Sequence, residues 1–211
     1  IIKNGNVFIN NKFQINNIVI NNGKIIDITK NLKNHKAKKT INAKNKNIIP
    51  GVIDVHFHVR APSFPKRGTV ESESKAAAKG GITTLFEMPI SNPCMSNAKV
   101  LLDRKKHFST NTIINYAFIP AIGKLTNDNL KGLIENGAIA FKIFTIAAPP
   151  NRKSEFDGLC FTKEKEILNA LIHAKKSNLV TIFHAEDQSL LDYYKNHEYK
   201  FSIIISDSYC P

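Results

Sequence analysis

The feature that most constrains the fold is a regular alternation of short apolar runs and longer amphipathic runs that begins around Pro50-Gly51. The apolar runs have the length of buried strands, and we expect strands at 48–56, 82–88, 112–119, 138–144 and 179–184. The amphipathic runs predict helices at 70–79, 97–108, 128–136, 163–177 and 188–195, with Thr162 as a possible N-cap. Strands that alternate with helices build a parallel sheet, so this part of the chain belongs to the α/β class.

Residues 1–50 follow a different pattern, in which isoleucine-rich runs are separated by pairs of residues that tolerate positive φ. These pairs are Asn4-Gly5, Asn10-Asn11, Asn16-Asn17 and Asn22-Gly23. Such pairs form hairpin turns, which predicts a small antiparallel β module. We therefore expect two domains, a β module at 1–50 and an α/β part at 51–211.

The charge of the chain is strongly positive, +13, but its composition argues against a nucleic-acid partner. The cations are 26 Lys and only 4 Arg, and Arg is the residue that recognises phosphates and bases with a planar fork. A solvated, soluble surface is the better interpretation.

Cysteine usage and hydropathy bear on location. Cys94, Cys160 and Cys210 are far apart and odd in number, which fits a reducing compartment. The longest apolar stretch, 137–150, is too short to span a bilayer and contains Lys142. We expect a cytoplasmic protein without a membrane partner.

Ligand-capable side chains follow three of the expected strands. His56 and His58 close the first strand and point to the same face, Lys142 lies in the fourth, and His184 ends the fifth. Each has an ordinary alternative: a hydrogen-bonded surface pair, a lysine reaching past a sheet edge, a satisfied strand-end histidine. Together they predict a metal site, because neutral imidazoles suit zinc and a desolvated amine can add carbon dioxide to give a bridging carbamate.

Four motifs carry a family resemblance: PGVIDVHFHVR at 50–60, KAAAKGGITTLFEMP at 75–89, GAIAFKIF at 137–144 and FHAED at 183–187. They resemble the amidohydrolase superfamily, and within it the cyclic amide hydrolases, namely dihydroorotase, allantoinase and dihydropyrimidinase or hydantoinase. The resemblance implies an N-terminal fragment with an incomplete (β/α)₈ barrel of about five strands, preceded by part of a small β-sandwich.

The resemblance also implies roles for single residues. His56 and His58 match the ligands of the more buried metal, Lys142 matches the carboxylated lysine that bridges two Zn²⁺ ions, and His184 matches a ligand of the second ion. Asp54 is expected to order the end of the first strand. No catalytic residue is expected in this chain, because the family's catalytic aspartate and next histidine ligand would follow its last residue.

The same resemblance implies a reaction in which a metal-bridging hydroxide hydrolyses a ring amide. Arg60 is the residue that best discriminates between the possible substrates. The pattern H-x-H-x-R resembles dihydroorotase, in which this arginine binds the substrate carboxylate, and Asn92 is a weaker match to an assisting asparagine. This favours interconversion of dihydroorotate and carbamoyl aspartate, in pyrimidine metabolism. The loop 61–68, APSFPKRG, departs from the usual dihydroorotase E-P-G pattern.

Several alternatives stay open. Arg60 could instead form a structural ion pair, and the substrate could be that of an allantoinase or of a hydantoinase or dihydropyrimidinase. A third alternative is a non-catalytic fragment or scaffold relative. The expected partner is a small cyclic amide, with a homo-oligomer in the full-length protein, and the 211-residue chain alone is expected to be inactive.

Overall fold

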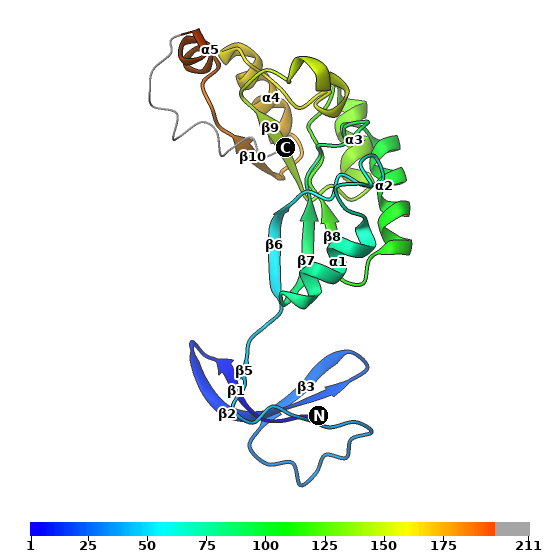
Figure 1. Cartoon of the computed structure of the whole chain (residues 1–211), viewed down its shortest axis with the longest axis vertical. Helices are drawn as coiled ribbons and strands as arrows, with labels where there is room; N and C mark the ends of the chain where they lie inside the picture. Colours follow the sequence, from blue (N-terminus) through cyan, green and yellow to red (C-terminus); the bar gives the residue numbers. More distant parts are fainter. Residues whose placement is uncertain (197–211) are drawn as a thin grey trace. The chain divides into compact units, whose positions relative to one another are not determined.

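Two units make up this chain, Ile1–Gly51 and Val52–Pro211, and the structure, a computed structural model, describes residues 1–196. Figure 1 shows the elements of each unit. Cys210 and the last residues of the expected 51–211 domain lie outside the described residues.

The first unit is a five-stranded sheet. Its strands are β1 (Ile2–Ile9), β2 (Lys12–Asn21), β3 (Lys24–Thr29), β4 (Ile41–Asn42) and β5 (Asn47–Ile48). Their order is β3-β2-β1-β4, with β5 also paired to β1. The two hairpins turn at Asn10-Asn11 and Asn22-Gly23, as predicted, but β4 and β5 run parallel to β1, so the expectation of a purely antiparallel module is wrong for these two strands.

Two of the four predicted hairpin turns lie inside strands instead. Asn4 adopts a φ of 60° within β1, where the register with β2 shifts. The side chain of Asn17 in β2 accepts a hydrogen bond from the backbone N–H of Asn4 at 3.0 Å and donates to the carbonyl of Thr29 at 2.8 Å. An asparagine pair can therefore mark a bulge whose lost ladder bonds are replaced by a side-chain amide, which local pattern does not distinguish from a turn.

The second unit contains five parallel strands in sequence order. They are β6 (Val52–Phe57), β7 (Ile82–Glu87), β8 (Asn115–Phe118), β9 (Ala140–Phe144) and β10 (Val180–His184). β6, β7 and β8 form one ladder and β9 and β10 another. Two backbone hydrogen bonds join these ladders. Ile139, just before β9, donates to Phe118 at the end of β8, and Lys142 of β9 donates to Pro120, just after β8. The observed architecture is the mixed α/β one that the alternation predicts.

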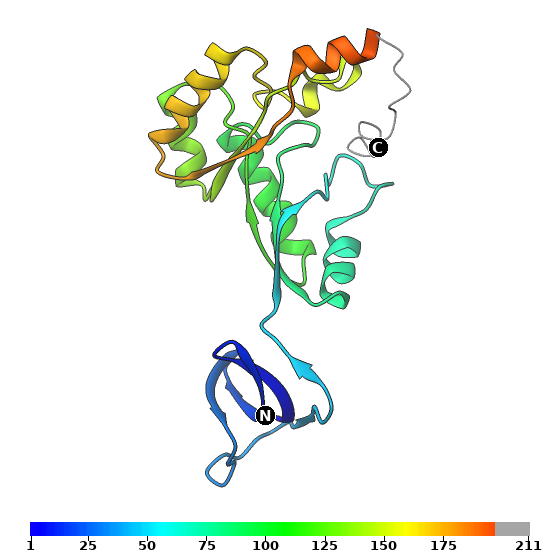
Figure 2. The same ribbon diagram turned by 90° about the vertical axis from the view of Figure 1, so that its left-hand side faces the viewer.

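Helices follow the strands, as Figure 2 shows from a second side. They are α1 (Val70–Lys79), α2 (Ala98–Asn111), α3 (Asn127–Glu135), α4 (Glu164–Lys175) and α5 (Gln188–Asn196), with a 3₁₀ helix η1 (Pro150–Glu155) after β9. Thr69, Asn97 and Thr126 cap the first three with their side chains. The N-cap of α4 is Lys163 and not Thr162, because Lys163 is the last extended residue and its N–H is bonded by the Glu166 carboxylate at 3.4 Å.

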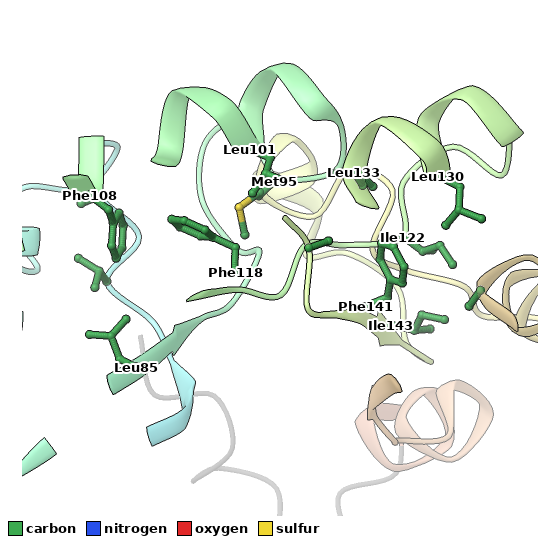
Figure 3. Packing of buried hydrophobic residues seen from close by; sticks show 14 of the residues in the cluster. Leu85, Met95, Leu101, Phe108, Phe118, Ile122, Leu130, Leu133, Phe141 and Ile143 are labelled. Atoms are coloured by element: carbon green, nitrogen blue, oxygen red, sulfur yellow. The ribbon is translucent and has the colours of Figure 1, made fainter. Parts of the chain in front are cut away.

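The core lies between the helices and one face of the strands. Figure 3 shows the side chains that fill it, which come from α2, α3 and β7 to β9 and the loops between them: Leu85, Met95, Leu101, Phe108, Phe118, Ile122, Leu130, Leu133, Phe141 and Ile143. A smaller cluster of Met88, Ile119 and Ala140, with Phe86 and Ile182 against it, is formed by the alternate positions of the same strands. Alternate residues of a strand face opposite sides, so this second cluster marks the face away from the helices.

Among residues 1–196, none of the helices is both long enough and apolar enough to cross a membrane.

Candidate metal centre

The four predicted metal ligands lie on the strand face that the helices do not cover. Phe57 packs against the helix-side core, so His56, one residue earlier in β6, faces the other way. In β9 both neighbours of Lys142 pack on the helix side, which turns Lys142 to the same face as His56. Ile182 of β10 packs in the smaller cluster on this face, and His184, two residues later, shares its direction.

The histidines are close enough to act on one another. The ring centroids of His56 and His58 are 5.2 Å apart. Burial, followed by the charges of His56, Arg60, Lys142 and His184, lowers the pKa of His58 to about 3. This imidazole is therefore neutral at physiological pH, and its buried Nδ1 makes no hydrogen bond to any residue in the described part of the chain. A neutral, unpaired imidazole nitrogen is the form that binds a metal ion.

Lys142 is desolvated by its strand. All five residues of β9 are buried, Lys142 is only 2% exposed, and its backbone N–H is fixed by the carbonyl of Pro120 at 2.9 Å. Burial lowers the pKa of the ammonium, and Nζ lies 5.5 Å from the ring centroid of Phe144. Desolvation favours the neutral amine, which is the species that adds carbon dioxide.

His184 is held from two directions. Its ring stacks on Phe144 at 4.3 Å with an interplanar angle of 19°, and its Nε2 is hydrogen-bonded to the carboxylate of Glu186. The backbone N–H of Glu186 donates to the hydroxyl of Thr145 at 2.9 Å, which fixes the turn after β10. With Nε2 engaged by the carboxylate, Nδ1 is the nitrogen left with a lone pair for a ligand.

Asp54 fixes the backbone near the end of β6. Its carboxylate accepts a hydrogen bond from the N–H of His56 at 3.0 Å, an ordering role like the one expected from the sequence. Its charge also raises the pKa of His56, against the larger lowering by burial and by Lys142.

Arg60 lies just beyond the histidine pair and has unusual backbone geometry. Its φ is +57°, and its Nη1 is buried without a hydrogen bond to residues 1–196. Burial, then the charges of Arg152 and Arg67, lowers the pKa of its guanidinium, so the local surface is rich in positive charge. This side chain has a hydrogen-bond donor that an anionic ligand could use.

Asn92 is exposed and is positioned through its backbone. Its carbonyl accepts a hydrogen bond from the hydroxyl of Ser63 at 2.5 Å, and the same hydroxyl lies 3.2 Å from its N–H. Ser63 belongs to the loop that carries Arg60. The structure thus joins the loops of the two predicted substrate-binding residues, and among residues 1–196 no hydrogen bond joins Asn92 to the four candidate ligands.

Sequence reasoning missed Glu87, which ends β7. It is fully buried and accepts hydrogen bonds from the backbone N–H groups of Val59 and Arg60 at 2.9 and 3.1 Å. The available signal was a carboxylate closing an apolar strand, which needs a buried partner to be stable.

The described residues fit a divalent cation only if the lysine takes part. Among residues 1–196, no three side chains of His, Cys, Asp or Glu lie close enough to hold a metal ion by themselves. Addition of carbon dioxide to Lys142 would supply the missing anionic oxygens beside the unpaired nitrogen of His58. Nitrogen and carboxylate-like oxygen donors together suit zinc or a similar ion.

Comparison with solved structures gives the class to which this arrangement belongs. The chain superimposes on L-hydantoinase (dihydropyrimidinase) from Arthrobacter aurescens with a TM-score of 0.81 and 26% identity, over 92% of this chain and 42% of that one. The fold is therefore that of the amidohydrolases.

Sequence comparison gives the family within that class. The sequence profile described as "Dihydro-orotase-like" matches residues 45–203, so the chain belongs to the dihydroorotase-like family. It is 31% identical to a dihydroorotase of Fusobacterium nucleatum over 96% of this chain and 45% of that protein. It is 27% identical to an L-hydantoinase of Paenarthrobacter aurescens over 82% of this chain and 37% of that protein. The chain thus spans less than half the length of these relatives.

Proposed function

We propose that the protein carrying this chain is a metal-dependent hydrolase of cyclic amides that interconverts dihydroorotate and carbamoyl aspartate. The observation that supports it best is the convergence of His56, His58, His184 and the buried Lys142 on one strand face, in a chain of the dihydroorotase-like family. In the reaction, water adds to a ring amide carbonyl, the carbon–nitrogen bond breaks, and the leaving nitrogen takes a proton.

The four side chains divide the work of holding the metal. His56 and His58 would bind one Zn²⁺ through neutral imidazoles, and Lys142, as its carbamate, would bridge to a second ion bound by His184. Bound zinc lowers the pKa of water and polarises a carbonyl oxygen. The residues of this chain orient that chemistry: Glu186 and Phe144 fix the ring of His184, and Asp54 fixes the backbone of His56.

Arg60 would select the substrate. Its buried, unpaired Nη1 supplies a charge-assisted bond to the carboxylate of dihydroorotate, a group that allantoin and hydantoin lack. Asn92, on the adjoining loop, would assist Arg60 in binding this substrate.

The same proposal extends to the fold. The five parallel strands β6 to β10 are interpreted as the first five of a (β/α)₈ barrel, whose ligand-bearing rim is the usual place for an active site. The sheet of Ile1–Gly51 is interpreted as part of a β-sandwich. We further propose a cytoplasmic homo-oligomer as the working form.

A hydantoinase activity is the second candidate, because the structural comparison is with a hydantoinase at a TM-score of 0.81. The test uses a polypeptide that carries this sequence and extends over the full length of its dihydroorotase relatives. Metal content is measured, and turnover is assayed on dihydroorotate, allantoin and hydantoin. Arg60→Ala should raise the KM for dihydroorotate and leave metal content unchanged.

Each other outcome selects an alternative. Turnover of hydantoin or allantoin without dihydroorotate would reassign the substrate. Metal-free protein without turnover of any of the three rings would indicate a scaffold relative. Dihydroorotate turnover unaffected by Arg60→Ala would remove the proposed role of that residue.

A further inference from the structure

A buried ion pair lies beside the candidate centre and has no part in the function proposed so far. The carboxylate of Glu87 at the end of β7 is fully buried, and Arg104 of α2 is 3% exposed. Nη1 of Arg104 lies 3.8 Å from Oε1 of Glu87 and, among residues 1–196, makes no hydrogen bond. Burying two charges is costly, and hydrophobic residues often replace such a pair without loss of stability, so stability alone is a weak reason for it.

The carboxylate holds the first of two loops. Its Oε2 accepts the N–H of Val59 at 2.9 Å and its Oε1 accepts the N–H of Arg60 at 3.1 Å. These are the two residues that follow His58, and Arg60 is in the left-handed region with φ +57°. A non-glycine residue leaves that region readily unless its surroundings hold it, so Glu87 sets the direction in which the Arg60 side chain leaves the backbone.

The guanidinium holds the second loop. Nη2 of Arg104 donates a hydrogen bond to the hydroxyl of Ser91, and that hydroxyl donates to the carbonyl of Pro93 at 2.8 Å. Asn92 lies between these two residues. One charged pair therefore anchors both the segment that carries Arg60 and the segment that carries Asn92.

We propose that Glu87 and Arg104 are positioning residues that fix Arg60 and Asn92 together, so that both are aligned with the same bound ring. Arg104 links the two loops, because it pairs with Glu87, which bonds the Arg60 loop, and donates to Ser91, which belongs to the Asn92 loop. Ser63 links them directly through its bonds to Asn92. The role in ring binding rests on the proposed function, whereas the anchoring of the loops does not.

The anchoring is tested in this chain by amide hydrogen exchange, measured by NMR. Glu87→Gln keeps one acceptor oxygen and loses the other, so the amide of Val59 or of Arg60 should exchange at least about tenfold faster. The matched control is Glu155→Gln, a buried carboxylate of η1 that is paired with Arg152 at 2.7 Å. This control should leave both amides unchanged.

A second variant covers the case in which Glu87→Gln does not fold, since it leaves Arg104 as an unpaired buried charge. Combining Glu87→Gln with Arg104→Met removes that charge, and the amides of Val59 and Arg60 should again exchange faster. Unchanged protection of both amides in whichever of these variants folds overturns the anchoring.

The role in binding is tested in the full-length polypeptide defined above. Glu87→Gln should raise the KM for dihydroorotate about tenfold or more, with kcat within about twofold and metal content unchanged, because only the fit of the ring is altered. A raised KM in Arg60→Ala but an unchanged KM in Glu87→Gln overturns the positioning role alone. Absence of dihydroorotate turnover in the unsubstituted protein overturns the proposed function, and the exchange experiment then still decides the anchoring.

Discussion

Strands β9 and β6 both carry candidate ligands, yet their surroundings differ sharply. Every residue of β9 is buried, whereas β6, at the end of its sheet, exposes Val52, Ile53 and Val55. The inner strand desolvates Lys142 and favours its amine, while the outer strand leaves His56 accessible to solvent. The strand face that the helices do not cover thus combines a buried lysine with a solvent-exposed histidine.

The largest expected effect on activity is at Lys142 of β9. Lys142→Ala in the full-length polypeptide should lower kcat/KM at least about 10⁴-fold, because it removes the one proposed ligand among residues 1–196 that would supply anionic oxygen. Steady-state assays and metal analysis measure the change. Lys131→Ala, on the exposed face of α3, is the control and should be silent. Retained turnover in Lys142→Ala would show that Lys142 is not a metal ligand.

The cost of truncating a side chain should also differ between β9 and β6. Phe141→Ala, at a fully buried position of β9, is expected to lower the free energy of unfolding by about 3–5 kcal/mol. Val55→Ala, at a position of β6 that is 57% exposed, should cost less than about 0.5 kcal/mol. Urea titration of both variants measures the difference. Equal costs would contradict the contrast between the two strands.

Glu87, at the end of β7, allows a test by the pH dependence of stability. Burial raises the pKa of Glu87 from 4.5 to about 7, against the hydrogen bonds from Val59 and Arg60 and the charge of Arg104. Its unfolded form therefore loses the proton at lower pH than its folded form. Stability should fall by up to about 3 kcal/mol as pH rises from 4.5 to 7, and then level off.

Glu87→Gln should abolish this slope, as measured by urea titrations between pH 4.5 and 8. Glu135→Gln, on the exposed surface of α3, should leave the slope in place. A slope that survives Glu87→Gln would have to come from other groups.

The smallest expected effect on the candidate metal centre concerns the turn after β10. Glu186→Gln replaces the carboxylate that engages Nε2 of His184, and the affinity for zinc in the full-length polypeptide should fall about 10–100-fold. Competition with a chelator measures the affinity. Glu164→Gln, in the first turn of α4, is the control, and identical affinities in the two variants would show that Glu186 does not orient a ligand.

Much of the second unit could be predicted from local pattern. The helix at 70–79 has the predicted bounds, because Thr69 caps it and Gly80 ends it. The shared direction of His56 and His58 follows from strand alternation, and the amidohydrolase relationship follows from four ordered motifs. These features depend on residues close together in the sequence.

What could not be predicted depends on distant partners. Glu87 bonds residues 27 and 28 positions earlier, and Arg104 reaches Ser91 from another element. Asn17 serves a bulge at Asn4 through a side-chain bond that no local rule indicates. Each is a polar group whose partner is set by tertiary packing.

The pairing of Glu87 with Arg104 has a consequence for redesign of substrate preference. Glu87 is hydrogen-bonded to the Arg60 loop, and its ion-pair partner Arg104 is hydrogen-bonded to the Asn92 loop. A substitution that shifts one of these loops should therefore disturb the other as well. Under the proposed function, libraries that randomise the Arg60 segment alone should yield mostly variants with weakened ring binding. Productive changes of ring preference should then arise as paired substitutions, one in the Arg60 loop and one in the Asn92 loop.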